Sequence, residues 1–288
     1  MKLLSKYKPF ILILTRFFLK FCKFAETILF DLMYLVDTHS HLYESDFEED
    51  RSEVLERLLK NGVTRVLLPN IDRESLPNML ALEASNQNLF SSMIGLHPTS
   101  VGANYKEELQ FIKESAIQHS YCAVGEIGLD FYWDKTYAEE QVDALKEQVG
   151  WALDWNLPVA LHVRKAMPEI IDTLKGFDKN RLRGVFHSFS GSIESASEIA
   201  RLGDFYYGIN GVVTFKNAGI AEVVKELPLD RIVLETDCPY LTPVPFRGKR
   251  NESSYVIYVA EKIAEVKGIS VEEVAEQTTL NAKRLFNL

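Results

Sequence analysis

Apolar runs of two lengths alternate along the chain after residue 33. Short runs rich in β-branched residues, such as VTRVLLP and PVALHV, predict buried strands. Longer segments with apolar residues three or four positions apart, such as DRSEVLERLLKNG, predict amphipathic helices. Strands are expected at 34–38, 63–69, 89–98, 121–130, 158–163, 183–189, 204–211 and 230–237. Helices are expected at 50–62, 73–86, 105–118, 137–155, 167–176, 192–203, 218–227, 251–267 and 270–287.

This alternation predicts the fold class. Each expected strand is followed by a helix, which implies an α/β protein with a parallel sheet covered by helices. Eight such units favour a closed (β/α)8 TIM barrel over an open doubly wound sheet. No Gly-x-Gly-x-x-Gly sequence opens a helix after the first strand, so a dinucleotide-binding fold has no support. No repeat or linker interrupts residues 33–288, which we expect to form a single domain.

Residues 1–32 differ from the rest of the chain and are expected to be an N-terminal extension. They carry six Lys or Arg residues against two acidic ones, and their apolar segment PFILILTRFFLKF is interrupted by Arg16 and Lys20. The segment is too short and too charged for a membrane span of about 20 apolar residues, and no small-residue cleavage site follows it. Two interpretations stay open: a basic amphipathic anchor on a membrane surface, or an extension upstream of a physiological start at Met33. We favour the second.

Composition and charge narrow the choice of partners. The 288 residues are 47% hydrophobic and 25% charged, as in ordinary globular proteins. A net charge of -9 argues against a broad electrostatic surface for nucleic acid, although a small phosphate site with its own cations remains compatible with it. The scattered cysteines Cys22, Cys122 and Cys238 indicate reduced thiols rather than a disulfide framework. We therefore expect a cytoplasmic protein that contacts a membrane only if the extension is retained.

Imidazole and carboxylate side chains recur where strands are expected to end. In a barrel, the C-terminal strand ends form one rim, which carries the active site. Mixed imidazole and carboxylate ligands suit Zn²⁺, Mn²⁺, Fe²⁺ or Co²⁺ and hold Mg²⁺ less well. Six such ligands are too many for one catalytic zinc, so two ions about 3.5–4 Å apart are expected. The predicted metal ligands are His39, His41, Glu126, His162, His187 and Asp237.

Two of the predicted ligands are also the predicted catalytic residues. Glu126 has two oxygens and is expected opposite the first strand, so it is the natural bridge between two ions. Asp237 is expected to accept the proton of the attacking water while it contacts a metal. The remaining assignment places one ion on His39, His41 and Asp237, and the other on His162 and His187.

Other polar residues near the same rim are predicted to contact a substrate. Arg164 lies two residues beyond His162, and a guanidinium there can hold a phosphate through two hydrogen bonds. The loop TPVPFRGKRNES after the last strand is locally basic, and barrels often bind phosphate in this region. Asp130 is a candidate for orienting a metal ligand, and Tyr132 and Trp133 could either stack on a base or pack in a loop. The predicted substrate contacts are His97, Arg164, Arg247, Lys249 and Asn251; His97 could instead support the metal ligands.

Six motifs in this order, DTHSH, GLHP, GEIGLDFY, LHVRKA, FHSFSG and ETDCPYL, resemble the TatD family of metal-dependent deoxyribonucleases. This family belongs to the wider amidohydrolase-like barrel group, and the likeness covers residues 33–288. The resemblance implies phosphodiester hydrolysis that depends on two divalent ions (Mg²⁺, Mn²⁺ or Zn²⁺) held by the same six residues. It also implies a monomer that acts on DNA, with RNA as an alternative substrate, and no obligate protein partner. We therefore predict a 3′-5′ exonuclease-like enzyme that prefers single strands or strand ends and uses a water activated by two metals.

Two other functions remain as alternatives. A hydrolase of the same barrel group could cut a C–N or ester bond, as a deaminase, a lactonase or an aminoacyl-RNA ester hydrolase. The basic loop after the last strand argues against a small neutral substrate, which would have no use for it. A non-catalytic metal-binding or nucleic-acid-binding module is the second alternative. All six ligand positions are intact, which argues against it.

Overall fold

The computed structural model describes residues 34–288. The predicted extension at residues 1–32 and the predicted start at Met33 lie outside the described residues. Within the part that is described, no helix is long and apolar enough to cross a membrane.

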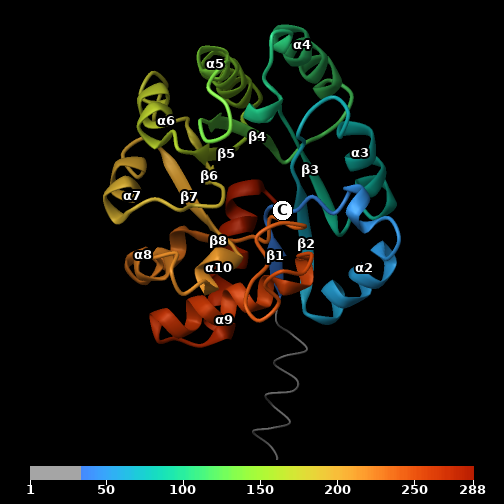
Figure 1. Cartoon of the computed structure of the whole chain (residues 1–288), viewed down its shortest axis with the longest axis vertical. Helices are drawn as coiled ribbons and strands as arrows, with labels where there is room; N and C mark the ends of the chain where they lie inside the picture. The colour runs from blue at the N-terminus through green and yellow to red at the C-terminus, as the bar shows by residue number, and fades with distance from the viewer. Residues whose placement is uncertain (1–33) are drawn as a thin grey trace, which may run out of the picture.

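Eight parallel strands form the centre of the molecule and follow one another in chain order around the sheet (Figure 1). Hydrogen bonds from Thr38 N to Leu234 O (2.9 Å) and from His41 N to Cys238 O (2.8 Å) join the first and last strand regions, so the sheet closes into a (β/α)8 TIM barrel. The strands are β1 (Leu35–Asp37), β2 (Val63–Leu68), β3 (Phe90–Ile94), β4 (Ala123–Asp130), β5 (Val159–Arg164), β6 (Arg183–Phe186), β7 (Asp204–Ile209) and β8 (Ile232–Leu234).

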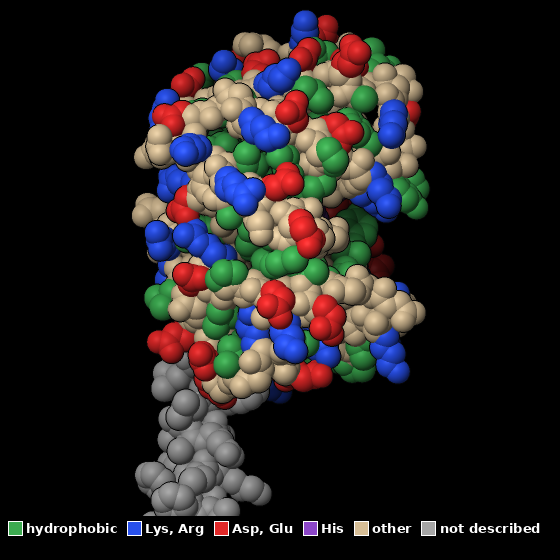
Figure 2. Space-filling model, turned by 90° about the vertical axis from the view of Figure 1, so that its left-hand side faces the viewer, with side chains coloured by type: hydrophobic (Ala, Val, Ile, Leu, Met, Phe, Trp, Pro, Cys, Tyr) green, Lys and Arg blue, Asp and Glu red, His purple; other side chains and the backbone are tan. Residues whose placement is uncertain are grey.

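Helices surround the strands in the outer ring of Figure 1, as the apolar stripes in the sequence predict. On the face that carries α6, α7 and α8, basic and acidic side chains are interspersed (Figure 2). The helices are α2 (Arg51–Lys60), α3 (Leu76–Ser85), α4 (Tyr105–Ala116), α5 (Ala138–Trp155), α6 (Met167–Leu174), α7 (Ile193–Ile199), α8 (Ile220–Glu226), α9 (Val256–Lys267) and α10 (Val271–Phe286).

The barrel has an apolar interior that α10 covers. A large apolar layer packs between the strands and the outer helices, and a smaller cluster fills the barrel itself. Leu285 and Phe286 of α10 are buried in that smaller cluster against residues from the strands, among them Val36 and Tyr206. Figure 1 shows the C-terminus near the centre of the barrel. The packed interior and α10 leave the C-terminal strand ends as the part of the barrel open to chemistry.

Several predicted boundaries differ from the observed ones. Strand β4 ends at Asp130, as predicted, because residues 127–130 pair with β5, so Glu126 does not lie at a strand end as the other candidate ligands were expected to. The regular pairing shifts between Val124 and Ile127, so Glu126 lies at an irregularity inside the strand. Strand β8 ends at Leu234, three residues earlier than predicted, and α7 ends at Ile199 rather than at 203.

Candidate metal centre

The six predicted ligands come together at the C-terminal ends of the strands. Their donor atoms form overlapping groups in which every atom lies within 4.8 Å of the others. The groups are His39, His187 and Asp237; His39, His41 and Glu126; and His97, Glu126 and His162. Residues 39 and 41 follow β1, residue 126 lies in β4, residue 162 in β5, residue 187 follows β6, and residue 237 follows β8. Five separate segments therefore supply one cluster, which His97 also approaches.

The Glu126 carboxylate lies at the centre of this cluster. Its Oε2 is 3.0 Å from His39 Nε2 and 3.8 Å from His41 Nε2. Its Oε1 is 2.8 Å from His162 Nδ1 and 3.7 Å from His187 Nε2. Each oxygen thus faces a different pair of imidazoles, which is the arrangement that a bridging carboxylate requires.

The surroundings of Glu126 keep it ionised. Burial by itself would raise the pKa of this carboxyl, which is only 3% exposed. The neighbouring imidazoles, His39 first and then His97 and His187, outweigh burial and hold the pKa well below its usual range. The group is therefore a carboxylate at neutral pH.

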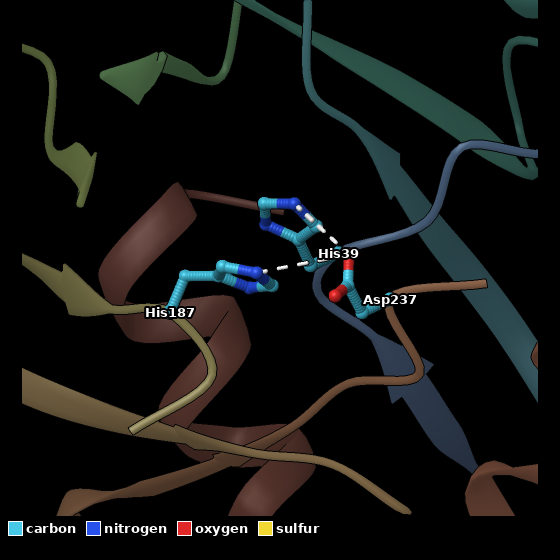
Figure 3. A group of neighbouring side chains, drawn as sticks. All are labelled: His39, His187 and Asp237. Carbon is cyan, nitrogen blue, oxygen red and sulfur yellow. Dashed lines mark ion pairs between the residues drawn. The ribbon is translucent and has the colours of Figure 1, made fainter. Parts of the chain in front are cut away.

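Asp237 supplies the second carboxylate, which lies beside His39 and His187 (Figure 3). Its Oδ1 lies 3.5 Å from His41 Nε2, 3.7 Å from His187 Nε2 and 3.9 Å from His39 Nε2. Its side chain is 14% exposed, against 3% for Glu126, so it is the carboxylate that solvent reaches more easily. Its backbone adopts a φ of 59°, a left-handed conformation that residues other than glycine rarely adopt and that concentrates at functional sites.

Two of the histidine rings are stacked beside Asp237 (Figure 3). The centroids of His39 and His187 are 3.4 Å apart, with 20° between the ring planes. The Nδ1 of His39 is buried and has no hydrogen-bond partner among residues 34–288, while its Nε2 faces Glu126. The two rings therefore present their Nε2 atoms to the same carboxylates.

The hydrogen bonds of Tyr43 assign the proton on His41. The Tyr43 hydroxyl donates to Pro69 O at 2.6 Å, so it must accept at its contact of 2.8 Å with His41 Nδ1. Nδ1 then carries the proton, and Nε2 presents its lone pair to the two carboxylates. Burial raises the pKa of Tyr43 well above its usual value, so the hydroxyl keeps the proton that this arrangement requires.

Carboxylates hold the outer nitrogens of two other imidazoles. His162 Nε2 is hydrogen bonded to Asp130 Oδ2 at 3.0 Å, and His187 Nδ1 lies 3.1 Å from Glu235 Oε1. Burial alone would lower both imidazole pKa values. Asp130 followed by Glu126 raises the pKa of His162 to about 9, and Glu235 followed by Glu126 raises that of His187 to about 10. A cation that binds the inner nitrogens must therefore displace protons.

His97 differs from the other histidines because the nitrogen that faces the cluster carries a proton. Its Nδ1 accepts hydrogen bonds from Thr99 N at 3.1 Å and from the Thr99 hydroxyl at 2.6 Å. Burial lowers the pKa of His97 and outweighs the nearby Glu126 carboxylate, so the ring is neutral. The proton of a neutral ring must then lie on Nε2, which is 3.5 Å from Glu126 Oε1. His97 thus presents an N–H donor rather than a lone pair to the cluster.

The donor chemistry fits divalent cations. The inner nitrogens of four histidines face two ionised carboxylates. The outer nitrogens of His41 and His162 are hydrogen bonded to other side chains, and that of His187 lies 3.1 Å from a carboxylate, as is usual for metal-binding imidazoles. Two of the three overlapping groups share Glu126, so the set suits two ions better than one.

The predicted substrate contacts differ in their exposure to solvent. The Arg164 side chain is exposed at the end of β5, and Arg247 and Lys249 are exposed in the loop after β8. Asn251 is fully buried, and its amide donates to Thr236 O (2.9 Å) and Tyr240 O (2.6 Å). The prediction that Asn251 contacts a substrate therefore disagrees with its position, because its hydrogen bonds hold the loop to the rim.

Two further side chains from the polar segments have structural roles. Arg250, which made the same loop appear more basic, donates to Asp50 at 2.6 Å. Asp37 precedes the paired histidines with the same alternation, but it is fully buried and accepts from Thr236 N (2.9 Å) and the Thr236 hydroxyl (2.6 Å). Its carboxylate joins β1 to the segment after β8 and does not face the cluster.

Sequence reasoning missed three side chains that orient the cluster. Tyr43 continues the alternation of His39 and His41, and this repetition was the only signal available for it. Glu235 precedes Asp237 by two residues, and Thr99 follows His97 by two. Their partners in the fold could not be read from these spacings.

The chain is similar in sequence and in fold to known proteins. The sequence profile of the family described as TatD related DNase matches residues 36–287. The metal-dependent hydrolase YabD of Bacillus subtilis is 42% identical over 255 residues, which cover 88% of this chain and 99% of that protein. The 3′-5′ ssDNA/RNA exonuclease TatD of Erwinia amylovora is 30% identical and covers 88% of this chain and 100% of its own length. The crystal structure of the TatD homologue YjjV from Escherichia coli has a TM-score of 0.80 and 31% identity, with 88% and 98% of the two chains covered.

Proposed function

Because the chain belongs to the TatD family of metal-dependent hydrolases, we propose that it hydrolyses phosphodiester bonds of DNA from free 3′ ends of single strands. The relative from Erwinia amylovora, a 3′-5′ exonuclease for single-stranded DNA and RNA, supports this choice of bond and end. RNA is the second candidate polymer on the same ground.

The observation that carries the proposal is that the two carboxylate oxygens of Glu126 face different pairs of histidines. Its Oε2 faces the histidines after β1, and its Oε1 faces those of β5 and β6. We infer that these five residues and Asp237 would hold two divalent cations, with the two oxygens of Glu126 available to both. Such a pair supplies Lewis acidity and a water that loses its proton at neutral pH.

Proton transfer and phosphate binding are assigned to side chains of the protein. Asp237 is the more exposed carboxylate of the two and stays ionised; burial would raise its pKa, but His187, followed by His41 and His39, lowers it. It is therefore suited to take the proton of the attacking water. The N–H of His97 Nε2 points toward the cluster and can donate to a non-bridging phosphate oxygen. Arg164 adds a fixed positive charge two residues from His162.

A parallel assay tests the proposed function. The purified protein is incubated with Mg²⁺, Mn²⁺ or Zn²⁺ and with end-labelled single-stranded DNA, duplex DNA, single-stranded RNA, and amide and carboxylic ester substrates. We expect mononucleotides to be released from the 3′ end of the single strands. If only the amide or ester substrates turned over, the barrel-group alternative would replace the nuclease.

Asp130 gives a prediction about metal affinity. Its two oxygens accept from Tyr132 N (2.9 Å) and face His162 Nε2 (3.0 Å). In Asp130→Asn an NH₂ group replaces one of these oxygens. This NH₂ group cannot accept a hydrogen bond from the N–H donor that it faces. We expect metal affinity to fall by about 10- to 100-fold, measured by calorimetric titration with Mn²⁺ or Zn²⁺, with activity recovering at high metal concentration.

Asp134→Asn is the matched control for this change. Asp134 lies in the same loop, is exposed, and bonds only Thr136 among the described residues. Its substitution should leave the metal affinity within twofold of wild type. An Asp130→Asn protein with the wild-type affinity would show that Asp130 does not orient His162 for a metal.

A further inference from the structure

Two large aromatic side chains are exposed at the rim beside the metal centre. Tyr132 is 50% exposed and Trp133 is 71% exposed in the loop after β4. Their ring centroids lie 4.9 Å apart in an edge-to-face arrangement. The sequence left open whether these rings pack in the loop or remain available. Their exposure shows that much of both rings is open to solvent, which is unusual for adjacent aromatic residues.

A guanidinium group lies against both rings. The Cζ of Arg164 is 4.0 Å from the Tyr132 centroid and 4.9 Å from the Trp133 centroid. This stacking restricts the long arginine side chain while its N–H groups keep their capacity to bind an anion. The rim thus combines two aromatic surfaces with one positioned cation.

Trp133 also forms a wall of a hollow next to this group. The hollow has a volume of about 300 Å³ and lies between the loops after β3 and β4, with Pro98, Thr99, Asp130 and Asp134 among its walls. The carboxylate oxygens of Asp130 and Asp134 on these walls can accept hydrogen bonds from the N–H groups of a base.

Hydrogen bonds tie this hollow to the metal centre. Asp130 faces His162 Nε2 at 3.0 Å and accepts from Tyr132 N at 2.9 Å. Thr99, on the other wall, donates to His97 Nδ1. Asp130 therefore links the proposed ligand His162 to the backbone of the loop that carries the two aromatic rings.

We propose that Tyr132 and Trp133 form a stacking platform for the nucleobase next to the scissile phosphate, while Arg164 holds a phosphate of the same strand. This proposal rests on the proposed function and names the part of the substrate that is recognised. A base in a duplex is paired and stacked between its neighbours, so it reaches the platform only after it is unpaired. Base stacking on aromatic rings tolerates any sequence. The platform therefore selects single-stranded ends without selecting their sequence.

The test compares two substrates in the metal-loaded enzyme. One is a single-stranded oligonucleotide; the other is the same oligonucleotide with its two terminal nucleotides replaced by abasic residues. For Trp133→Ala we expect kcat/KM to fall about 5- to 150-fold on the first substrate and to stay within twofold of wild type on the second. Trp133→Phe should recover most of the activity, because it keeps an aromatic face.

Tyr34→Ala is the matched control. Tyr34 is an aromatic residue with 55% exposure that precedes β1, at the other end of the barrel. Its substitution should affect neither substrate. An equal loss for Trp133→Ala on both substrates, or no loss on either, would overturn the platform.

A binding measurement separates this proposal from the proposed function. Trp133 is highly exposed, whereas Trp151 is 3% exposed, so an added base should quench the fluorescence of Trp133 in particular. We expect deoxyadenosine monophosphate to quench the emission of the metal-loaded protein, and deoxyribose 5-phosphate to leave it unchanged. Quenching in a protein that cleaves no oligonucleotide would support the platform and refute the nuclease. Equal emission with both compounds would refute the platform, even in an active nuclease.

Discussion

Glu126→Gln should reduce kcat/KM on single-stranded DNA by on the order of 10³-fold or more, the scale on which central electrostatic groups act. The substitution preserves the size of a side chain that is 3% exposed, but it removes the negative charge that four imidazoles face. An amide oxygen and an NH₂ group cannot both act as anionic ligands, so the two inferred cations lose their common carboxylate. The measurement is steady-state hydrolysis of an end-labelled oligonucleotide, together with the metal content of the purified variant.

Glu83→Gln is the matched control for this experiment. Glu83 is also a buried glutamate beside a histidine, with Oε2 2.7 Å from His119 Nε2 and 2.8 Å from the Ser92 hydroxyl that donates to it. It lies outside the cluster, so its substitution should change stability only. Hydrolysis by this variant should equal that of wild type at a temperature where circular dichroism shows that the variant is folded. If Glu126→Gln retained wild-type hydrolysis and bound metal, the proposed role of this carboxylate would be wrong.

Removal of divalent cations should abolish hydrolysis and lower thermal stability together. The metal-free cluster brings four imidazoles and two carboxylates into a buried space, and cation binding to the folded state alone stabilises it by mass action. At a free cation concentration one hundred times the dissociation constant, one site contributes about 2.7 kcal/mol. For a protein of this size that corresponds to an increase in Tm of several degrees, on the order of 5 °C.

The measurement combines elemental analysis, thermal unfolding and activity on one protein sample. After treatment with chelator and desalting, we expect no hydrolysis and a lower Tm. Titration with Mn²⁺ or Zn²⁺ should restore both, with about two ions bound per chain. Full activity in a sample shown to be metal-free would contradict the metal-dependent mechanism. A content of one ion per chain would retain the metal-dependent hydrolase and remove the proposed pair.

The barrel and the convergence of the cluster could both be predicted from local patterns. Short apolar runs and amphipathic segments alternate in a way that only a parallel sheet covered by helices can bury. Once the strands are parallel, their C-terminal ends must meet at one rim. His39, His162 and His187 follow or end apolar runs, so their common location required no knowledge of long-range contacts.

Two expectations differ from the structure: Glu126 does not end its strand, and Asn251 is not exposed. Glu126 lies inside β4 because residues beyond it continue to pair with β5, and the apolar pattern of GEIGLD does not record that pairing. Asn251 belongs to a polar loop that reads as exposed. Its amide instead bonds the carbonyls of Thr236 and Tyr240, which are 15 and 11 residues away in the chain.

Local sequence patterns are sufficient to predict the eight-unit barrel and the side chains at its rim, because periodicity and strand direction are local properties. The nitrogen of each imidazole that faces the centre depends instead on contacts made in the folded protein. The proton on His41 depends on Pro69 through Tyr43, and the orientation of His162 depends on Asp130. The tertiary structure also decided that Trp133 is exposed rather than packed. Hydrogen-bond direction and exposure depend on partners that are distant in the chain, and those partners are defined only when the barrel closes.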